Sequence, residues 1–233
     1  MKKRSGEGGD LAAAPPDPIA FIRRHMRLAP APSLPEIRLY AAHPASGLWR
    51  LVASHGEGPP PYWAYQWAGG AALARHILDR PETVAGLRVL DLGAGSGIVA
   101  IAAAKSGAKS VLAADIDRNA IAAIGLNASA NGVDIDAICD DLTAGAPPLV
   151  DLVLVGDLFY AEELAVRATA FLDTCLAAGI GVLVGDPGRA FLPRARLRLL
   201  AEYRAPDFGD GKDSATKTSA VFSFEPPRAS ENL

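Results

Sequence analysis

The sequence predicts an α/β protein of the doubly wound, Rossmann-like class, with helices on both faces of a mostly parallel sheet. In residues 89–98 an apolar run ends in Asp91, and a glycine-rich turn then leads into the helical run 98–104. Four later apolar runs also end at or beside acidic residues. Strand, tight turn and helix in repeated order are typical of parallel sheets. The length of 233 residues, half of them hydrophobic, fits a single domain with an N-terminal extension.

The glycine-rich turn predicts a ligand site. Its glycines alternate as GxGxG, whereas the dinucleotide fingerprint GxGxxG places the third glycine one residue later, and no Lys-Ser/Thr pair follows as in a Walker loop. Glycine lets a ligand lie against bare backbone, and a carboxylate at a strand's end suits a cationic amino group better than a pyrophosphate. We therefore expect an aminoacyl nucleoside, S-adenosylmethionine, although the motif alone leaves NAD open. The expected contacts are Asp91, Gly93, Ala94, Gly95, Ser96 and Gly97.

Composition narrows the classes of partner. The formal charge is −3 and the pI about 5.8, without the basic character typical of nucleic-acid binders. No apolar run is long enough to span a membrane, and no apolar core of a secretory signal follows the basic residues 1–4. Cys139 and Cys175 lack metal-ligand spacing, so we expect reduced, buried thiols and no metal. Arginine outnumbers lysine by 17 to 6 and alanine is abundant, which indicates a GC-rich genome and a bacterial source. We also expect a cytoplasmic protein and a monomer.

The N-terminal part predicts a tail followed by a small extension. Residues 1–16 are rich in Gly, Ala, Pro and charge without periodicity, so we expect disorder. Asp17 before a proline predicts the start of a helix that includes Leu28. Residues 37–40 alternate as an edge strand does, and residues 56–61 predict a loop.

Aromatic residues are concentrated in residues 61–70, which hold two of the three tryptophans and two of the five tyrosines. These rings can pack as a lid on the sheet, or form a pocket wall that stacks on a ligand, and the two roles are compatible. We expect Trp67 to contact the cofactor and Trp63 the substrate. The predicted extension with its lid therefore spans 17–67, and a helix over 71–78 follows.

The second predicted parallel strand, residues 110–115, ends in Asp115, 18 residues after Gly97. An acidic residue at this strand tip can accept hydrogen bonds from both ribose hydroxyls of a nucleoside. We expect Asp115 and Ile116 to bind the cofactor, although an acid here does not separate NAD from S-adenosylmethionine. Asp117 is expected to cap the next helix.

A short third strand over 135–138 precedes Asp140 and Asp141. A polar side chain at this place can bond the adenine amino group, and we assign that contact to Asp141. For Asp140 we expect a solvated turn residue.

The fourth strand, residues 151–156, neighbours the glycine-turn strand across the switch point of a doubly wound sheet. The residues that follow should therefore face the reacting end of the cofactor. We expect catalytic roles for Asp157, Phe159 and Tyr160 in this segment. A helix over 162–176 comes next.

The fifth strand, residues 180–185, leads to a loop in which we expect Arg189 to contact substrate. A last helix near 192–200 and two strands near 201–206 and 219–224 are expected to close the sheet as an antiparallel hairpin. We interpret a group of arginines as the solvated side of that helix: Arg189, Arg194, Arg196 and Arg198.

Taken together, the glycine turn and Asp115 are similar to the cofactor site of class I methyltransferases. Residues 61–63, 67–70, 156–160 and 185–189 narrow the resemblance to the lysine methyltransferases of the electron transfer flavoprotein beta subunit, over about residues 17–226. That resemblance implies a seven-stranded sheet with an antiparallel last strand, in a methyltransferase domain over 68–226 followed by a tail, 227–233. It also implies S-adenosylmethionine as donor, S-adenosylhomocysteine as product and a lysine of that subunit as acceptor. One departure is Ala68, where the family has proline.

The residue types after the fourth strand fit a lysine acceptor. A lysine ammonium must lose its proton before it can accept a methyl group, because its nitrogen lone pair is occupied. Methyltransferases that act on planar amides or exocyclic amines carry Asn-Pro-Pro-Tyr/Phe here, whereas this chain has Asp-Leu-Phe-Tyr at 157–160. A carboxylate at Asp157 prefers a cationic amine, and the rings of Trp67, Phe159 and Tyr160 can favour it by cation–π contact.

Four other functions stay open from the sequence. A small-molecule amine methyltransferase would use the same fold and donor site. A ribosomal-protein methyltransferase would need an added recognition domain, for which too few residues precede Pro61. A non-catalytic module would tolerate a degraded donor site, but Asp91, the three glycines and Asp115 are all present. A nicotinamide oxidoreductase is disfavoured by the GxGxG spacing.

Overall fold

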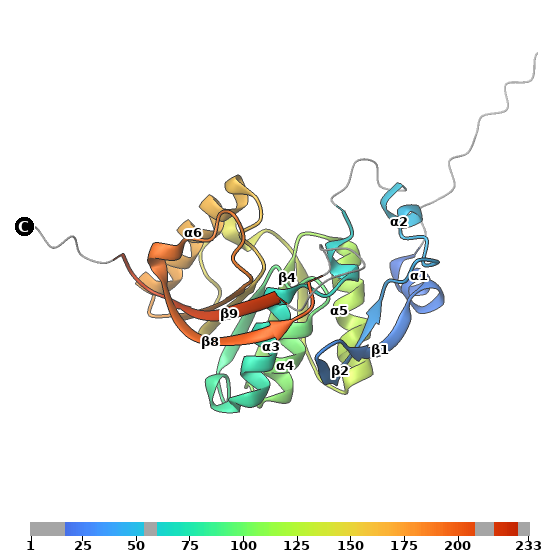
Figure 1. Cartoon of the computed structure of the whole chain (residues 1–233), viewed down its shortest axis with the longest axis horizontal. Coiled ribbons are helices and arrows are strands. Elements are labelled where there is room, and N and C mark those ends of the chain that lie inside the picture. The colour runs from blue at the N-terminus through green and yellow to red at the C-terminus, as the bar shows by residue number, and fades with distance from the viewer. Residues whose placement is uncertain (1–16, 54–59, 208–216, 228–233) are drawn as a thin grey trace, which may run out of the picture.

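A computed structural model describes residues 17–53, 60–207 and 217–227 (Figure 1). The expected disorder of residues 1–16 lies outside these residues, as do most of the predicted loop at 56–61 and nearly all of the predicted tail at 227–233. Within the described residues, no helix is both long and apolar enough to cross a membrane.

The described chain forms one seven-stranded sheet in the order β5-β4-β3-β6-β7-β9-β8. The first five strands in this order are parallel, whereas β9 runs antiparallel to β7 and β8 runs antiparallel to β9. This arrangement confirms the predicted doubly wound class and its closing hairpin. The strands are β3 (Arg88–Leu92), β4 (Ser110–Asp115), β5 (Asp136–Cys139), β6 (Leu152–Gly156), β7 (Gly181–Asp186), β8 (Leu197–Ala205) and β9 (Lys217–Phe224).

Alternation along the central strands builds a separate apolar core on each face of the sheet. In β3, Val89 faces the core beneath α3 (Ala68–Asp79) and α4 (Ile98–Lys105), while Leu90 faces the core beneath α6 (Glu162–Ala177). The strands β6 and β7 alternate in the same way, as the two-residue period of a strand requires. Figure 1 shows α6 apart from α3 and α4, with the sheet between them.

The N-terminal extension differs from its prediction. The helix α1 (Pro18–His25) begins where expected, with Asp17 accepting bonds from the first-turn amides, but it ends before Leu28. Leu28 lies in β1 (Arg27–Ala31), which pairs with β2 (Leu34–Ala41) as a two-stranded sheet of its own. Prolines in this stretch disfavour a helix, and pairing with β2 supplies the backbone bonds instead. A short helix α2 (Trp49–Ala53) follows, which the sequence did not predict.

Two amide side chains join this hairpin to the main domain. Asn127 and Asn131 of α5 (Arg118–Asn131) accept hydrogen bonds from the backbone N–H groups of Tyr40 and Arg38, at 2.8 and 3.0 Å. Asn127 also donates a hydrogen bond from its Nδ2 to the Ser96 carbonyl at 2.8 Å, so this one side chain joins the hairpin to the glycine-rich turn.

The predicted helix near 192–200 is wrong. Residues Arg194–Arg196 form one 3-10 turn, and β8 starts at Leu197 because the chain pairs with β9 along its whole length. The arginines of this region therefore do not share a solvated helix face, and Arg196 forms an ion pair with Asp173 of α6. The expectation of two buried thiols is also wrong: Cys175 is buried, but Cys139 is exposed, and both are free.

Glycines allow α3 to approach the ends of β6 and β7 very closely. A Cβ atom added to Gly69 would lie 2.3 Å from the Gly185 carbonyl oxygen, and one added to Gly156 would lie 2.9 Å from the Gly70 Cα. These distances are shorter than any real Cβ contact, so the backbones pack with no side chain between them. The first turn of α3 is thereby placed against Asp157, the residue after β6.

We expect Gly69→Ala to destabilise the fold, because its Cβ would also lie 2.7 Å from the buried Asp157 Oδ2. The free energy of unfolding in urea should fall by about 1–3 kcal/mol, as for other overpacked sites. Gly125→Ala is the matched control: it lies within α5 with no atom near the new Cβ, and should stabilise by about 0.5–1 kcal/mol. Equal stability of the two variants would contradict the close packing.

Candidate functional site

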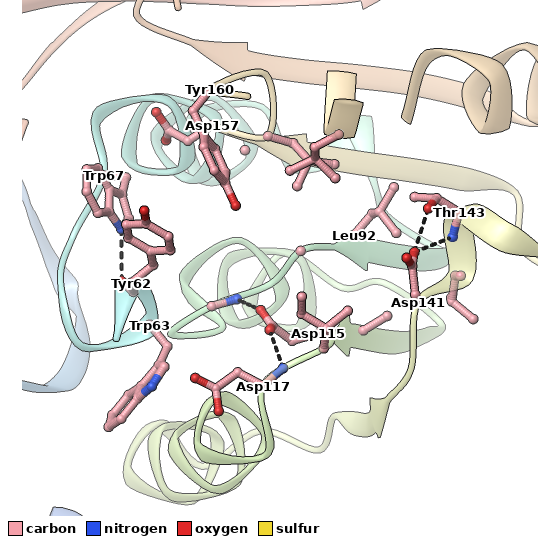
Figure 2. Close-up of a pocket in the computed structure, with 18 of the residues that line it drawn as sticks. Tyr62, Trp63, Trp67, Leu92, Asp115, Asp117, Asp141, Thr143, Asp157 and Tyr160 are labelled. Atoms are coloured by element: carbon pink, nitrogen blue, oxygen red, sulfur yellow. Dashed lines mark hydrogen bonds between the residues drawn. The ribbon is translucent and has the colours of Figure 1, made fainter. Parts of the chain in front are cut away.

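A cavity of about 350 Å³ lies at the carboxyl ends of the central strands, where open α/β sheets bind their ligands (Figure 2). It is lined by residues from the glycine-rich turn, the tips of β4, β5 and β6, and the aromatic segment before α3. The structure brings together these predicted site residues: Trp63, Trp67, Gly93, Gly95, Asp115, Ile116, Asp141, Asp157, Tyr160 and Arg189. Asp91, Ala94, Ser96, Gly97 and Phe159 are not among its lining residues.

Asp115 at the tip of β4 is fixed by backbone amides on both of its oxygens. Its Oδ2 accepts a bond from the Gly95 N–H at 2.8 Å, and its Oδ1 accepts one from the Asp117 N–H at 2.9 Å. Burial raises the pKa of this carboxyl, while the amide bonds oppose that shift. The carboxylate therefore faces the cavity in a set position and also holds the glycine-rich turn.

Three positive φ angles shape that turn, at Gly93 (70°), Gly95 (53°) and Gly97 (78°). Only the first two glycines line the cavity. Gly97 instead begins α4, and a Cβ there would press on Ile124 of α5 at 3.2 Å. The alternation thus combines exposed backbone at the cavity with close packing behind it.

Asp91 lies beneath the turn, away from the cavity lining. Only 2% of its surface is exposed, and its Oδ2 accepts a bond from the Ala100 N–H of α4 at 2.9 Å. Burial raises the pKa of the Asp91 carboxyl to about 7. In the described structure Asp91 links β3 to the first turn of α4, and its predicted contact with a ligand stays a prediction.

Two acidic residues follow β5 at the cavity. Asp141 accepts bonds from the Thr143 N–H and hydroxyl groups at 3.1 and 2.5 Å, and its Oδ2 lies 3.5 Å from an Arg167 nitrogen. Asp140 is exposed, as expected, but it also lines the cavity. The sequence did not predict that Asp140 lines the cavity, because an acidic residue in a turn has the same neighbours in sequence whether or not it faces a pocket.

Aromatic rings form the opposite wall. The Trp67 indole N–H donates to the Tyr62 carbonyl at 2.9 Å, and the Tyr62 ring lies 5.7 Å from that of Trp67 and 5.5 Å from that of Tyr160. Tyr62 was not singled out in the sequence, although it lies in the aromatic segment. Phe159 is fully buried in the core beneath α6, so its ring supports the wall from behind.

Trp63 lines the cavity beside the glycine-rich turn. Its backbone lies 3.7 Å from the position of a Cβ on Gly95, and its ring is 3% exposed in a cluster with α1 and α5. The aromatic segment therefore reaches both ends of the site, with Trp63 at the glycine-rich turn and Trp67 near Asp157 (Figure 2).

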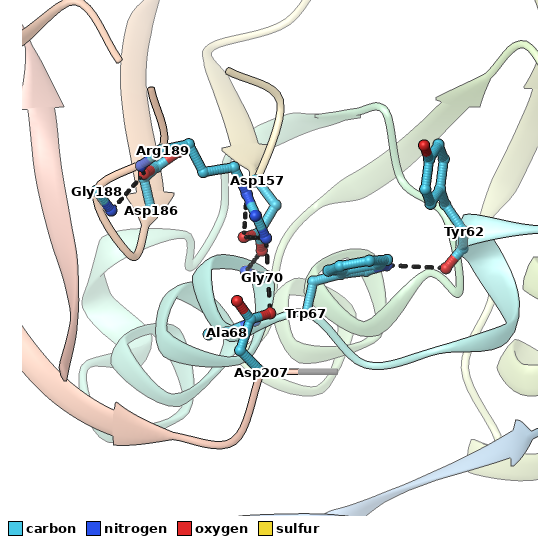
Figure 3. A network of polar contacts seen from close by, with 9 residues as sticks. All are labelled: Tyr62, Trp67, Ala68, Gly70, Asp157, Asp186, Gly188, Arg189 and Asp207. Carbon is cyan, nitrogen blue, oxygen red and sulfur yellow. Dashed lines mark hydrogen bonds and ion pairs between the residues drawn. The ribbon is translucent and has the colours of Figure 1, made fainter. Parts of the chain in front are cut away.

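Asp157 and Arg189 form a buried ion pair at the far end of the cavity (Figure 3). Asp157 Oδ1 accepts bonds from two Arg189 nitrogens, at 2.5 and 3.0 Å, and its Oδ2 accepts the Gly70 N–H of α3 at 2.6 Å. Burial raises the pKa of Asp157 to about 6, although Arg189 and the Gly70 amide both act to lower it. Asp157 also has a φ of 57°, in the region that favours glycine, and its contacts hold it there.

Further contacts fix the Arg189 side chain. Its guanidinium lies 5.3 Å from the centre of the Trp67 ring, and 3.6 Å from Asp207, which also accepts the Ala68 N–H of α3. Asp186 Oδ1 accepts the Arg189 backbone N–H at 2.7 Å. Asp207 lay outside the sequence prediction, because no local motif relates it to this site.

Comparison with known proteins places the chain in a family. It is 40% identical over 90% of its length to the electron transfer flavoprotein beta subunit lysine methyltransferase of Xenopus laevis, and covers 87% of that protein. It is 38% identical over 89% of its length to the protein of that name from Rattus norvegicus, of which it covers 84%. The chain belongs to this methyltransferase family.

Two further comparisons agree with a methyltransferase family and with the observed fold, respectively. The ribosomal protein L11 methyltransferase (PrmA) family matches residues 72–155, which hold the glycine-rich turn and Asp115. A Pyrococcus horikoshii structure, provisionally described as an RNA methyltransferase, superposes with a TM-score of 0.53 at 17% identity. It covers 72% of this chain and 90% of its own, which shows a shared fold.

We expect Asp91→Asn to stabilise the protein in a pH-dependent way. The folded state holds the Asp91 proton more tightly than the unfolded state, whose pKa is near 3.8, so wild-type stability falls as the pH rises from about 4 to 7. Asparagine has no such proton, so the variant's advantage should grow over this range and level off above pH 7. At about 1.4 kcal/mol for each pH unit, the gain reaches the order of 4 kcal/mol.

Urea unfolding at a series of pH values measures this difference. Asp151→Asn is the control of opposite sign, because Arg88 lowers the pKa of Asp151 to about 2. Its deficit should be full above pH 4 and disappear as the pH falls through 2. A constant difference for Asp91→Asn across the range would contradict the assignment.

Proposed function

We propose that this protein is an S-adenosylmethionine-dependent protein-lysine N-methyltransferase that acts on the electron transfer flavoprotein beta subunit. One observation carries the proposal. A single cavity has a nucleoside-type acid, Asp115, against the glycine-rich turn at one end, and a buried ion pair, Asp157 with Arg189, among aromatic rings at the other. Family membership with proteins named for that activity supports the choice of acceptor.

The residues present fit the donor. The cavity volume lies in the range of small-molecule sites. Asp115 can accept hydrogen bonds from a ribose diol, and Asp141 can accept one from the amino group of the base. The bare backbone of Gly93 and Gly95 leaves room for the donor beside them. Gly93 has a φ of 70°, which favours glycine, and a Cβ there would also press on Leu158 Cδ1 at 2.7 Å. We assign donor binding to Trp67, Asp91, Gly93, Ala94, Gly95, Ser96, Gly97, Asp115, Ile116 and Asp141, with the residues outside the lining acting through the shape of the turn.

The acceptor end is assigned to the segment after β6. Asp157 and Tyr160 line the cavity there, with Arg189 beside them and Phe159 behind. Trp63 and Arg189 remain our candidates for contact with the substrate protein. The exposed rings of Tyr62 and Tyr160 offer an apolar path for a lysine side chain, with faces that attract a cation.

When bound, S-adenosylmethionine would supply a methyl group on a positively charged sulfur. The methyl–sulfur bond would break as the neutral amine nitrogen bonds to the methyl carbon, with the neutral thioether S-adenosylhomocysteine as the leaving group. The chain's own residues hold the acceptor in line and exclude water from the path. Aromatic walls reduce hydration of the amine, which favours its neutral form. Within the described residues, no group of three His, Cys, Asp or Glu side chains is arranged to hold a metal ion.

The acceptor is proposed to be protein rather than nucleic acid, since the composition carries a net negative charge. A ribosomal protein or a small amine is the alternative acceptor; the match to the L11 methyltransferase family over 72–155 covers the donor half of the site and says little about acceptor choice. We further propose that the protein acts in the cytoplasm, on the basis of its composition, and as a monomer.

Asp115→Asn should weaken donor binding, because the amide has no charge and can accept only one of the two backbone N–H bonds that now hold the glycine-rich turn. Loss of a charge-assisted acceptor costs about 1.5–3 kcal/mol, which corresponds to a Kd about 10- to 150-fold higher in calorimetric titration. Asp136→Asn, on an exposed residue at the start of the adjacent strand β5, is the control and should bind as the wild type does. The donor should raise the wild-type Tm, and NAD should not; equal stabilisation by NAD would overturn the donor assignment.

Methyl transfer to the flavoprotein is tested by intact-mass measurement. The beta subunit incubated with wild-type enzyme and donor should gain mass in steps of one methyl group. Purified RNA, a ribosomal protein and free lysine are assayed in parallel with labelled donor. Faster transfer to any of these than to the beta subunit would contradict the proposed acceptor.

A further inference from the structure

We propose that Arg189 is the positioning residue that balances the charge of Asp157, so that an incoming lysine meets a neutral ion pair instead of a free carboxylate. This inference rests on the proposed function and explains how the acceptor end of the cavity favours an uncharged amine. The starting observation is that Arg189 and Asp157 both line the cavity and are bonded to each other through two guanidinium nitrogens.

A free carboxylate at this place would oppose the reaction. An anion close to an ammonium stabilises the charged form, and a lysine paired with Asp157 would keep the proton that must leave before methyl transfer. Proton transfer to Asp157 itself is no remedy, since an amine is a far stronger base than a carboxylate. With Arg189 bound to Asp157, the incoming amine meets no net charge from the pair, and its proton is lost more readily to water.

Arg189 is held tightly enough to keep this arrangement when substrate arrives. Its side chain is 17% exposed, and the contacts of this residue come from four separate parts of the fold: Asp157 after β6, Asp186 at the end of β7, Asp207 after β8, and Trp67 before α3. Asp157 is equally fixed, because its second oxygen accepts the Gly70 N–H. Neither partner is therefore a mobile surface charge.

The other charges near the pair do not cancel this effect. Asp186 and Asp207 do not line the cavity. Asp207 accepts the Ala68 N–H in the first turn of α3, where the helix dipole supplies partial positive charge. Asp186 Oδ1 accepts the backbone N–H groups of Gly188 and Arg189, at 2.6 and 2.7 Å. The titratable groups that face the pair or the adjoining ring of Tyr160 are Asp186, Asp207, Tyr62, Tyr160, Asp115 and Arg167.

The test is the pH profile of kcat, which reports ionisations in the enzyme–substrate complex. In Arg189→Gln, the unbalanced Asp157 should hold the lysine as ammonium, so the acidic limb should move up by about one pH unit or more, while the acceptor KM does not rise. In Asp157→Asn, the unbalanced Arg189 should move that limb down and raise the acceptor KM. The double variant Asp157→Asn/Arg189→Gln restores a neutral pair, so its limb should return close to the wild-type position.

Arg196→Gln is the matched control. Arg196 is 14% exposed, pairs with Asp173 and lies over the Phe224 ring, so it repeats the contacts of Arg189 away from the cavity. Its profile should match that of the wild type. Calorimetric titration of S-adenosylmethionine and far-UV circular dichroism on every variant show whether the donor site and fold are intact.

The proposed function and the charge-balancing role of Arg189 are contradicted by different results. Wild-type enzyme that binds donor but transfers no methyl group to the beta subunit overturns the proposed function. If the wild type is active, shifts of the two single variants in the same direction, or a double variant no better than the worse single one, overturn the charge-balancing role alone. Variants that lose donor binding together with turnover also overturn it, because Arg189 would then serve only to support the fold.

Discussion

The contact between the first turn of α3 and the ends of β6 and β7 determines how the acceptor end of this protein is built. Gly69, Gly156 and Gly185 bring backbone against backbone here, since a Cβ on any of them would lie less than 3.0 Å from backbone atoms of the other element. Asp157 can then reach the Gly70 N–H from a strained φ of 57°, and its other oxygen is left for Arg189. A single methyl group at Gly69 would displace the Asp157 carboxylate, which is one partner of the ion pair. The packing of α3 and the geometry of the site therefore depend on the same contact.

Much of the main sheet could be predicted because its strands are apolar runs that are bounded by turn residues and helix caps. The glycine turn after β3, the cap Asp117 before α5 and Gly132 after it mark boundaries that the structure reproduces closely. Residues 192–200 could not be assigned in this way. Leucine and arginine alternate there, but both residues also favour helices, and only pairing with β9 decides for a strand. The strand predicted at 37–40 lies within β2, but β1 was missed for a related reason, since the prolines indicate where a helix breaks and not what forms between them.

The site was predictable where one short segment carries it, and not where distant segments meet. Gly95 and Asp115 were expected together from a known spacing, and a hydrogen bond joins them. Asp207 follows β8, and no pattern near it indicates a place in the site. Tyr62 was expected only as a member of the aromatic segment, because nothing in the sequence distinguishes it from the neighbouring rings. Asp91 shows a further limit: the sequence places it at the end of a strand, but only the structure shows that its carboxylate turns under the glycine turn toward α4.

A common rule explains how so many carboxylates are tolerated in this small region. Asp91, Asp115, Asp157, Asp186 and Asp207 each accept at least one backbone N–H, so the fold itself supplies the partners that water would otherwise provide. Burial nevertheless raises the pKa of Asp91, Asp115, Asp157 and Asp186, which means that these groups lower the stability of the fold at neutral pH. Burial of the two apolar cores on either side of the sheet offsets this loss of stability. The acids are thus oriented before any ligand binds, and binding energy need not be used to arrange them.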